Sequence, residues 1–357
     1  MSKKFRILAI NPGSTSTKVA VYENEELLMQ ETIHHSAEDL APFQKVTDEY
    51  EMRKETILGL LKEKDINLNT IDAVSGRGGG LKPVSSGTLG INETMVEDVR
   101  NSPGGHASVL GPLIADELSK EFDIPGFVVD PTSVDEFEDI ARISGWPELP
   151  RKSGFHPLNH KAVARKAAEE LGKPYEELNL VVAHIGGGVS VGAHRQGRII
   201  DVNIAEGGLF TPERACPPLS GLVRTCFSGD YTAGEIMKMM LGNGGIQAHL
   251  KTKDLREVEK MVQDGNEEAE LIFKAMGYQV SKAIGALSTV LKGKVDAIIL
   301  TGGCSHSKML TDWIKEDISY IAPVMVFPGE KELESLAFGA LRVLTGGEKA
   351  KEYPTTD

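Results

Sequence analysis

The stretch that decides the fold is ILAINPGSTSTKVAVYE, residues 7–23. Two apolar runs flank a break at Pro-Gly, and the break lacks the Asn-Gly or Asp-Gly pair that a plain two-residue hairpin favours. It carries instead a set of amide, hydroxyl and cationic groups: Asn11, Gly13, Ser14, Thr15, Ser16, Thr17 and Lys18. Donors around a backbone concavity are what a phosphate group requires. The stretch therefore predicts a phosphate-binding hairpin, although a Gly-rich turn can also be only a turn.

Length and composition bound the class of protein. The chain has 357 residues, 40% of them hydrophobic, which predicts two domains with separate cores. No run approaches the roughly 18 apolar residues of a membrane helix, and no signal-peptide cleavage site precedes the first strand pattern, so we expect a cytoplasmic protein. The net charge of −13 disfavours nucleic acid and anionic membranes as partners. Three cysteines without metal-ligand spacing indicate neither a disulfide framework nor a zinc site.

The order of expected elements is that of an α/β protein. Strands are expected near 5–11, 16–22, 26–33, 72–76 and 126–130, with helices near 51–63 and 107–121. Residues 144–159 carry three prolines and two glycines and are typical of a connector between domains. After it, Asn159 is expected to cap a helix that Gly172 ends.

The opening pattern then returns in LVVAHIGGGVSVGAHRQGRII, residues 180–200. An offset of 174 residues places Gly13 on Gly187 and Ser16 on Ser190, which predicts a duplicated fold with a ligand between its halves. The longest helix is expected between these motifs and the C-terminus, with Leu271, Val280 and Ile284 near one face. Residues 295–310 are expected to form a buried strand that ends in Gly302 and Gly303, followed by the start of a helix.

Five motifs, NPGSTSTK, GRGGG, SGFHPLNH, VAHIGGGVSVGAH and LTGGCSHS, resemble in this order the acetokinase family of the actin, hexokinase and chaperone ATPase superfamily. The resemblance spans nearly the whole chain. It implies a ribonuclease H-like, actin-like ATPase fold of duplicated βββαβαβα units, with one domain at 1–152 and 334–357 and the other at 153–333. ATP with Mg²⁺ would lie in the interdomain cleft and reversibly pass its γ-phosphoryl group to butyrate or a short branched carboxylate. A homodimer or higher homo-oligomer is also implied.

The resemblance implies a role for each matching residue. The catalytic residues would be Arg77, His156, Arg214 and Asp130. The metal would contact Asn11 and Glu332, with Glu330 and Glu334 as alternatives for the glutamate. Nucleotide and phosphate would contact Asn11, Gly13, Ser14, Ser16, Lys18, His184, Gly186, Gly187, Gly188, Asp254, Arg256, Gly302 and Gly303. The substrate pocket would include Gly78, Gly79, His106 and Phe155.

Two departures from the family pattern carry further expectations. Gly187 stands where acetate kinases carry Asn, so backbone N–H groups alone would contact phosphate there. In GRGGG, glycines replace the bulkier apolar residues that follow the arginine in acetate kinases, which predicts an emptier wall that admits longer acids.

Several residues allow a second interpretation. His106 lines the cleft or caps the helix that follows it, Asp130 belongs to the site or to a loop turn, and Phe155 touches the acid or is a core residue. His156 and His160 have the i, i+4 spacing of two metal ligands, but Pro157 and Asn159 place them across a helix start, and we reject a metal site there.

The chemistry favours a carboxylate acceptor. A carboxylate is ionised at pH 7, so the reaction needs charge neutralisation by arginines and a metal rather than a general base. The resemblance leaves an acetate or propionate kinase of the same family as an alternative. A sugar or polyol kinase would need Asp130 as base, and an ATP-gated binding protein of the same superfamily is the non-enzymatic alternative. A Rossmann dehydrogenase is disfavoured because GGGVSVG opens a strand instead of a helix.

Overall fold

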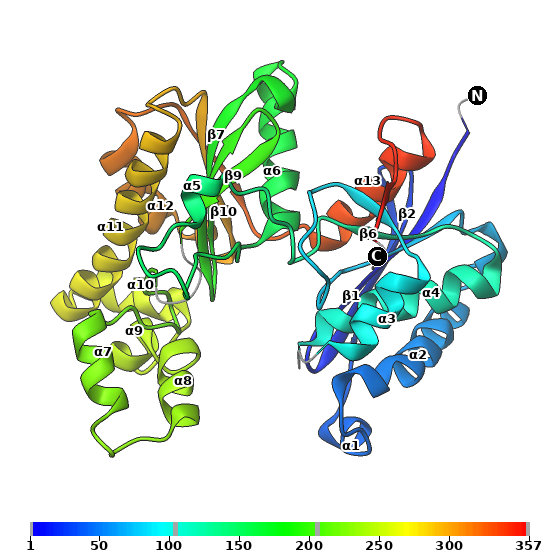
Figure 1. The fold of residues 1–357 in the computed structure, drawn as a ribbon, viewed down its shortest axis with the longest axis horizontal. Coiled ribbons are helices and arrows are strands. Elements are labelled where there is room, and N and C mark those ends of the chain that lie inside the picture. The colour runs from blue at the N-terminus through cyan, green and yellow to red at the C-terminus, as the bar shows by residue number, and fades with distance from the viewer. Residues whose placement is uncertain (1–2, 103–105, 204–207, 355–357) are drawn as a thin grey trace. The chain divides into compact units, whose positions relative to one another are not determined.

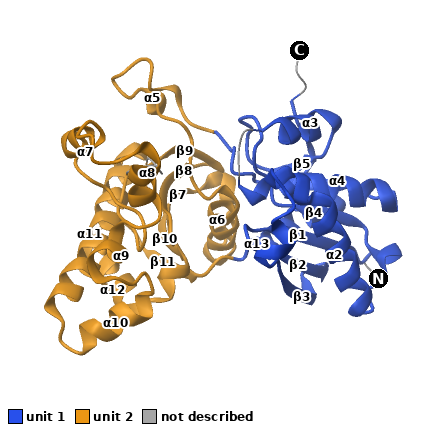
Figure 2. Ribbon diagram, turned by 90° about the horizontal axis from the view of Figure 1, so that it is seen from below, with its two compact units in different colours: residues 1–135, 331–357 blue, residues 136–330 orange. Residues whose placement is uncertain are grey.

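The computed structural model describes residues 3–102, 106–203 and 208–354. The chain divides into two compact units, unit 1 with residues 1–135 and 331–357 and unit 2 with residues 136–330 (Figure 2). The expected domain boundaries after residues 152 and 333 stay predictions of domain organisation. Within the described ranges, no helix is both long and apolar enough to cross a membrane.

Unit 1 is a mixed sheet covered by helices. Its seven described strands lie in the order β12-β5-β6-β4-β1-β2-β3, where β1 pairs antiparallel with β2 and parallel with β4. The strands are β1 Arg6–Pro12, β2 Ser16–Glu23, β3 Glu26–His34, β4 Ala73–Gly76, β5 Thr88–Gly90, β6 Gly126–Val129 and β12 Lys351–Glu352. The helices are α1 Ala37–Leu40, α2 Tyr50–Glu63, α3 Glu93–Asn101, α4 Leu110–Phe122 and α13 Glu332–Leu344, with short 3₁₀ turns η1 Val46–Glu49, η2 Leu68–Thr70 and η3 Ala107–Val109.

Unit 2 repeats the same strand plan in the order β11-β10-β7-β8-β9. Its strands are β7 Asn179–Ile185, β8 Val189–Arg195, β9 Arg198–Val202, β10 Ala297–Gly302 and β11 Val324–Pro328. Its helices are α5 Asp139–Arg142, α6 Pro157–Leu171, α7 Leu219–Cys226, α8 Ala233–Leu241, α9 Gly245–Leu250, α10 Leu255–Gln263, α11 Glu267–Val290 and α12 Lys308–Ile318, with 3₁₀ turns η4 Tyr175–Glu177 and η5 Gly303–His306 (Figure 1).

The duplication predicted from the sequence is confirmed by this topology. β7 pairs antiparallel with β8 and parallel with β10, as β1 does with β2 and β4. Successive side chains along a strand point to opposite faces of the sheet, so each sheet can bury apolar side chains on both of its faces. In unit 2, Val181 and Ala183 pack in one core with α11 and α12, whereas Leu180 and Val182 pack in another with α6.

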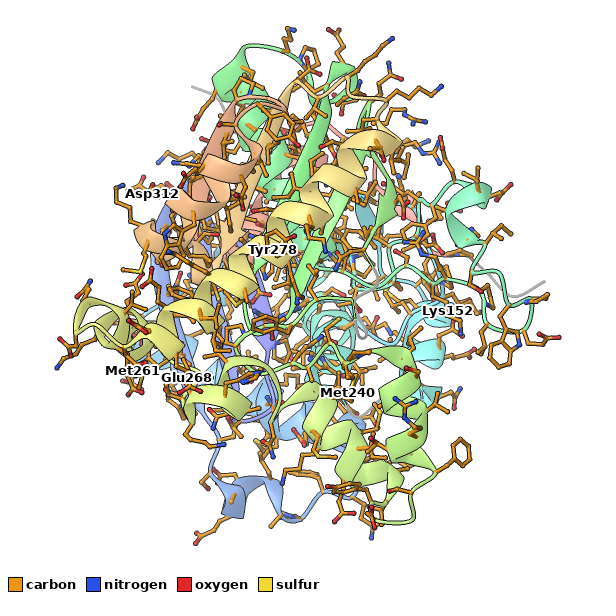
Figure 3. All side chains as sticks on the ribbon, turned by 90° about the vertical axis from the view of Figure 1, so that its left-hand side faces the viewer. Lys152, Met240, Met261, Glu268, Tyr278 and Asp312 are labelled. Atoms are coloured by element: carbon orange, nitrogen blue, oxygen red, sulfur yellow. The ribbon has the colours of Figure 1, made fainter. Side chains whose placement is uncertain are left out.

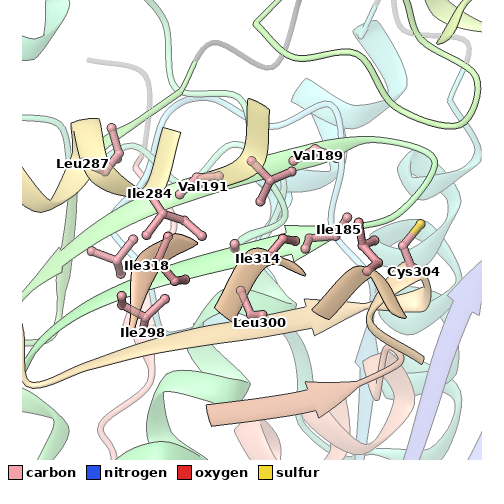
Figure 4. Packing of buried hydrophobic residues seen from close by; sticks show 14 of the residues in the cluster. Ile185, Val189, Val191, Ile284, Leu287, Ile298, Leu300, Cys304, Ile314 and Ile318 are labelled. Atoms are coloured by element: carbon pink, nitrogen blue, oxygen red, sulfur yellow. The ribbon is translucent and has the colours of Figure 1, made fainter. Parts of the chain in front are cut away.

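The larger core of unit 2 consists of branched aliphatic side chains from these layers. Figure 4 shows Ile284 of α11 and Ile314 of α12 in the same cluster as the strand residues Ile185, Ile298 and Leu300. Burying one such side chain contributes about 1.5–3 kcal/mol. The glycine-rich ends of β7 and β10 are thereby held on a rigid sheet.

The face of α11 differs from the prediction at its first turns. Val280 and Ile284 are buried as expected, but Leu271 is 68% exposed and Phe273 is buried in its place. Tyr278, seven residues after Leu271, also lies on the outer face of this helix (Figure 3). The expected stripe was wrong there because Ala269, Phe273 and Met276 set the contact with the sheet.

The start of α6 also differs. The helix begins at Pro157, with His156 as its N-cap residue, and ends at Gly172 in a left-handed conformation as expected. Asn159 was wrongly expected to be the cap. Proline at the first helical position has a fixed φ that suits the helix and needs no N–H partner, so the helix starts three residues earlier.

Candidate active site

Three predicted residues of unit 1 lie together where β1, β4 and α13 meet. Asn11 is near the end of β1, Arg77 follows β4, and Glu332 is the first residue of α13. The Asn11 amide donates a hydrogen bond to the Glu332 carboxylate, while Arg77 Nη1 lies 3.3 Å from Asn11 Oδ1 and 2.6 Å from Glu332 Oε1. The carboxyl ends of neighbouring parallel strands are where open α/β sheets place ligands.

Glu332 stands apart from the two alternative glutamates. Glu334 pairs with Lys331 at 2.9 Å, on the surface of α13. Glu330 belongs to unit 2, where its Oε1 lies 3.1 Å from His184 Nε2. Glu332 is the glutamate beside Asn11, and both offer oxygen atoms, the ligand type that Mg²⁺ prefers.

These two residues fit a magnesium ion but would not enclose one. Among the described residues, no three His, Cys, Asp or Glu side chains gather as a metal site. Mg²⁺ in phosphotransferases is commonly held by one or two carboxylates together with substrate phosphates and water. Asn11 and Glu332 would hold the ion in that manner, and the ion would neutralise phosphate charge.

The hairpin between β1 and β2 is held by a residue that sequence reasoning missed. The buried guanidinium of Arg53, on α2, donates to the carbonyl oxygens of Gly13 (2.8 Å), Ser14 (3.1 Å) and Ser16 (3.2 Å). Glu49 Oε2 accepts from the same guanidinium at 2.6 Å. Because the carbonyls of the turn point at Arg53, the loop is fixed around one buried cation.

The polar side chains of this hairpin are accessible. Ser14 and Lys18 are exposed and Ser16 is half-buried, and Lys18 lies opposite Asn11 in the β1–β2 register. Opposite residues of an antiparallel pair share one face of the sheet. Lys18 is therefore a cation on the same face as Asn11.

The glycines after Arg77 do not leave an open wall, contrary to the expectation. A Cβ on Gly79 would lie 1.9 Å from Ser108 Oγ, and one on Gly78 would lie 2.4 Å from Val128 Cγ1. The volume of the absent side chains is filled by the protein itself. A pocket role for Gly78 and Gly79 stays a prediction, but the reason offered for it is wrong.

His106 caps the 3₁₀ turn η3, which agrees with one of the two interpretations of this residue. Its Nδ1 accepts the backbone N–H of Ser108 and lies 2.8 Å from Ser108 Oγ. Burial lowers the pKa of His106 below its usual value, Arg77 lowers it further, and Glu332 opposes the shift. At pH 7 the ring is therefore neutral, with Nδ1 occupied as an acceptor.

Asp130 is a buried residue at the end of β6. It has a left-handed φ of 38°, and its Oδ1 accepts the backbone N–H of Gly87 at 2.7 Å. The carboxylate thus supports a loop turn, while its predicted catalytic role remains untested.

In unit 2, the turn between β7 and β8 is closed on itself. Gly186 N–H donates to Gly188 O at 3.0 Å, which leaves Gly187 exposed at the tip. Of the three backbone N–H groups expected to contact phosphate, that of Gly186 is therefore used within the turn. Thr211, which sequence reasoning missed, donates its hydroxyl to Gly187 O at 2.7 Å.

Arg214 lies against the same turn. Its guanidinium carbon would be 3.2 Å from a Cβ on Gly188, so a side chain there would displace the arginine. Thr211 Oγ1 accepts the Arg214 N–H at 2.9 Å. The Arg214 Nε is buried and has no hydrogen-bond partner among the described residues. An unpaired buried donor costs about 1–3 kcal/mol, which is expected where a ligand completes the site.

The two glycines after β10 have different roles. Gly302 has a φ of 88°, and a Cβ there would lie 2.5 Å from the Ile185 carbonyl oxygen, so this position requires glycine. Gly303 is exposed, with no atom within 4 Å of its Cβ position. A side chain at Gly303 would project into space that a ligand can use.

His156 and His184 stack at the end of β7. Their ring centroids are 3.9 Å apart with an interplanar angle of 15°. His184 Nδ1 lies 2.8 Å from Asn159 Oδ1, and His156 Nδ1 lies 2.8 Å from Ser190 Oγ. The rings are thus held face to face, with hydrogen bonds fixing each plane.

The remaining predicted residues lie in other surroundings. Asp254 caps α10 and pairs with the exposed Arg256 at 2.5 Å, which lowers the pKa of Asp254 to about 2. Phe155 is buried with its ring edge on His160, at a centroid distance of 5.3 Å. Nucleotide contact by Asp254 and Arg256 stays a prediction, and so does acid contact by Phe155.

One family model matches part of this chain, and known proteins match it over nearly its whole length. A family model described as the acetokinase family matches residues 147–318. Butyrate kinase 2 of Clostridium acetobutylicum is 52% identical over 354 residues, which cover 98% of this chain and 99% of that protein. The solved acetate kinase of Porphyromonas gingivalis has a TM-score of 0.79 and 20% identity, covering 95% of this chain and 100% of that one. A propionate kinase from Francisella tularensis has a TM-score of 0.75 and 20% identity, covering 94% and 98%.

The duplicated strand plan and these structural likenesses define an α/β protein with the actin-like ATPase fold. The chain belongs to the acetokinase family. It is accordingly an enzyme, a carboxylate kinase that uses ATP.

Proposed function

We propose that this enzyme transfers the γ-phosphoryl group of ATP to butyrate, or to a short branched carboxylate, and forms an acyl phosphate and ADP. The observation that carries the proposal is the 52% identity, over nearly both whole chains, with a protein named butyrate kinase 2. The residues gathered in each unit suit this chemistry. Phosphoryl transfer to an anion requires positioning and neutralisation of charge far more than a base.

The chain's own residues divide this work. Arg77, held beside Asn11 and Glu332, would bind an oxygen of the acid or of the transferred phosphoryl group through its planar fork. Arg214 would neutralise phosphoryl charge with the buried Nε that lacks a partner among the described residues. His156 would donate from Nε2 to an equatorial oxygen, since its Nδ1 faces Ser190.

The nucleotide would lie against the glycine-rich turns. The Gly13 N–H donates to Ser16 O at 2.7 Å and the Gly186 N–H donates to Gly188 O at 3.0 Å, so phosphate would contact other groups of the two turns. In unit 2, Gly303 leaves space for the nucleotide. Mg²⁺ held by Asn11 and Glu332 belongs to the same proposal. A cytoplasmic location and a homodimer or higher homo-oligomer are further parts of this proposal. Light scattering would measure the mass of the oligomer.

The experiment is detection of acyl phosphate as the hydroxamate, with ATP and acetate, propionate, butyrate, isobutyrate or isovalerate. Each buried CH₂ contributes about 0.8 kcal/mol, so burial of two more carbons would favour butyrate over acetate by about 15-fold in kcat/KM. A higher kcat/KM for acetate than for butyrate would contradict the proposed acid. Phosphorylation of hexoses instead of any carboxylate would contradict the reaction.

A further inference from the structure

A chain of hydrogen bonds runs through unit 2 from His156 to Tyr175. The successive contacts are His156 Nδ1 to Ser190 Oγ (2.8 Å), Ser190 Oγ to His160 Nε2 (2.9 Å), His160 Nδ1 to His194 Nε2 (3.2 Å) and His194 Nδ1 to the Tyr175 hydroxyl (2.7 Å). We call these five residues the histidine chain. It joins the N-cap of α6, the body of α6, β8 and η4.

The interior of the histidine chain is neutral. His160 and His194 are fully buried, with their rings stacked at a centroid distance of 5.5 Å. Burial lowers the pKa of both well below the usual value, so each ring carries one proton at pH 7. A neutral imidazole donates from one nitrogen and accepts at the other, and a hydroxyl has one proton to donate. The hydrogen bonds must therefore all point the same way, either toward Tyr175 or toward His156.

Two cations favour the direction toward His156. Lys161 Nζ lies 5.5 Å from the centroid of the Tyr175 ring, and Lys161 and Arg165 both depress the pKa of His194 by charge repulsion. Glu136 pairs with Lys161 at 2.8 Å and offsets part of its charge. A positive charge at the Tyr175 end repels the protons of the chain, which places each proton on the side of its donor that faces His156.

In that direction, Tyr175 donates to His194 Nδ1, and His194 Nε2–H donates to His160 Nδ1. His160 Nε2–H then donates to Ser190 Oγ, whose own proton goes to His156 Nδ1. With Nδ1 occupied as an acceptor, the ring proton that His156 can donate is on Nε2.

We propose that the histidine chain fixes His156 as the Nε2–H tautomer, so that the ring is ready to donate to a phosphoryl oxygen. The proposal rests on the proposed function, in which His156 acts on the transferred group. Tyr175, His194, His160 and Ser190 are positioning residues that act through His156. A core that only needed packing would not require this alignment of donors and acceptors.

The test is NMR of the full chain with ¹⁵N-labelled histidine, in which long-range couplings distinguish the two tautomers. The resonances of His156 are those that His156→Gln removes. The wild-type protein should show His156 as the Nε2–H form. Tyr175→Phe removes the terminal donor, which should give a mixture of His156 tautomers and lower kcat about tenfold with unchanged KM values.

Two further variants separate positioning from packing. In His194→Gln, the amide can accept from Tyr175 and donate to His160, so the Nε2–H tautomer of His156 should persist. Tyr353→Phe removes another buried tyrosine hydroxyl, which donates to Asp98 at 2.8 Å in unit 1, and should change neither the tautomer nor kcat.

An Nδ1–H tautomer in the wild-type protein would overturn the proposal, and so would Tyr175→Phe with the tautomer unchanged. Because NMR reports the tautomer without turnover, this outcome is distinct from failure of the proposed function. Failure of that function would appear as absence of acyl phosphate from every acid.

Discussion

Arg77 and Glu332 form an ion pair with an Nη1–Oε1 distance of 2.6 Å, although 255 positions separate them in the sequence. Asn11 contacts both side chains, so the pair is fixed on the sheet of unit 1. A guanidinium held in one orientation loses little rotamer entropy when it binds an anion. The pair therefore holds Arg77 ready for an oxyanion.

Arg77→Ala should lower kcat by about 10³-fold, the scale of arginines that neutralise phosphoryl charge. Arg100→Ala, on the surface of α3, is the matched control and should retain near-normal kcat. Steady-state kinetics with ATP and butyrate measure both. Near-normal turnover of Arg77→Ala would remove this residue from the catalytic group.

Arg53→Met should destabilise the protein and weaken ATP binding together. Breaking a buried ion pair costs about 3–5 kcal/mol, and here the carbonyl oxygens of Gly13, Ser14 and Ser16 also lose their donor. The hairpin would then lose its fixed shape, which should raise the KM for ATP at least tenfold. Urea denaturation and ATP titration measure the two effects.

Lys54→Met is the control for Arg53, because Lys54 is the next residue on α2 and its ion pairs are long, at 3.9 Å. It should change stability by less than about 1 kcal/mol. A loss of stability in Arg53→Met with an unchanged KM for ATP would mean that the hairpin does not bind nucleotide.

The pH dependence of stability should reflect His160 and His194. Both have a pKa in the folded state well below 6.5, so between that lowered value and 6.5 the unfolded chain binds more protons. The free energy of unfolding should therefore be highest above pH 6.5 and fall as the pH falls through 6.5 toward 5. Each histidine contributes up to about 1.4 kcal/mol per pH unit in this window.

Urea denaturation from pH 7.5 to 5 measures this slope. His194→Gln removes one of the two groups and should make the slope shallower by about half. An equal slope in the variant would mean that other groups cause the acid sensitivity.

The fold was largely predictable, because strand alternation and the repeat of the Gly13 hairpin at Gly187 are local patterns. The grouping of Asn11, Arg77 and Glu332 was predictable from the motifs that carry the resemblance, and the roles of these residues stay predictions. Arg53 was not predictable, because an arginine within a helical pattern is most often a surface charge. Thr211 and Tyr175 were missed for a different reason: their partners lie 24 and 19 positions away, and no spacing reveals such contacts.

Gly303→Val should raise the KM for ATP more than the KM for the acid. No protein atom lies within 4 Å of the Cβ position of Gly303, so the valine would enter space that we assign to the nucleotide. Gly285→Val, on α11, also adds its side chain without a neighbour within 4 Å and should leave both KM values unchanged. Equal effects of Gly303→Val on both substrates would argue for a purely structural role.

Gly79→Ala tests the packing of Ser108 against Gly79, which fills the space where an open pocket wall was expected. The new Cβ would lie 1.9 Å from Ser108 Oγ and 2.8 Å from Ser108 Cβ, so it would displace the turn that His106 caps. Overpacking of this kind costs about 1–3 kcal/mol. We expect lower stability and an equal loss of kcat/KM for acetate and butyrate, because Arg77 and His106 shift together. Adding Ser108→Gly should recover part of the stability, whereas Gly59→Ala, in open space on α2, should be neutral or slightly stabilising. A selective loss of butyrate activity in Gly79→Ala would instead show that this glycine faces the acid, since only a side chain in the pocket can distinguish the two chain lengths.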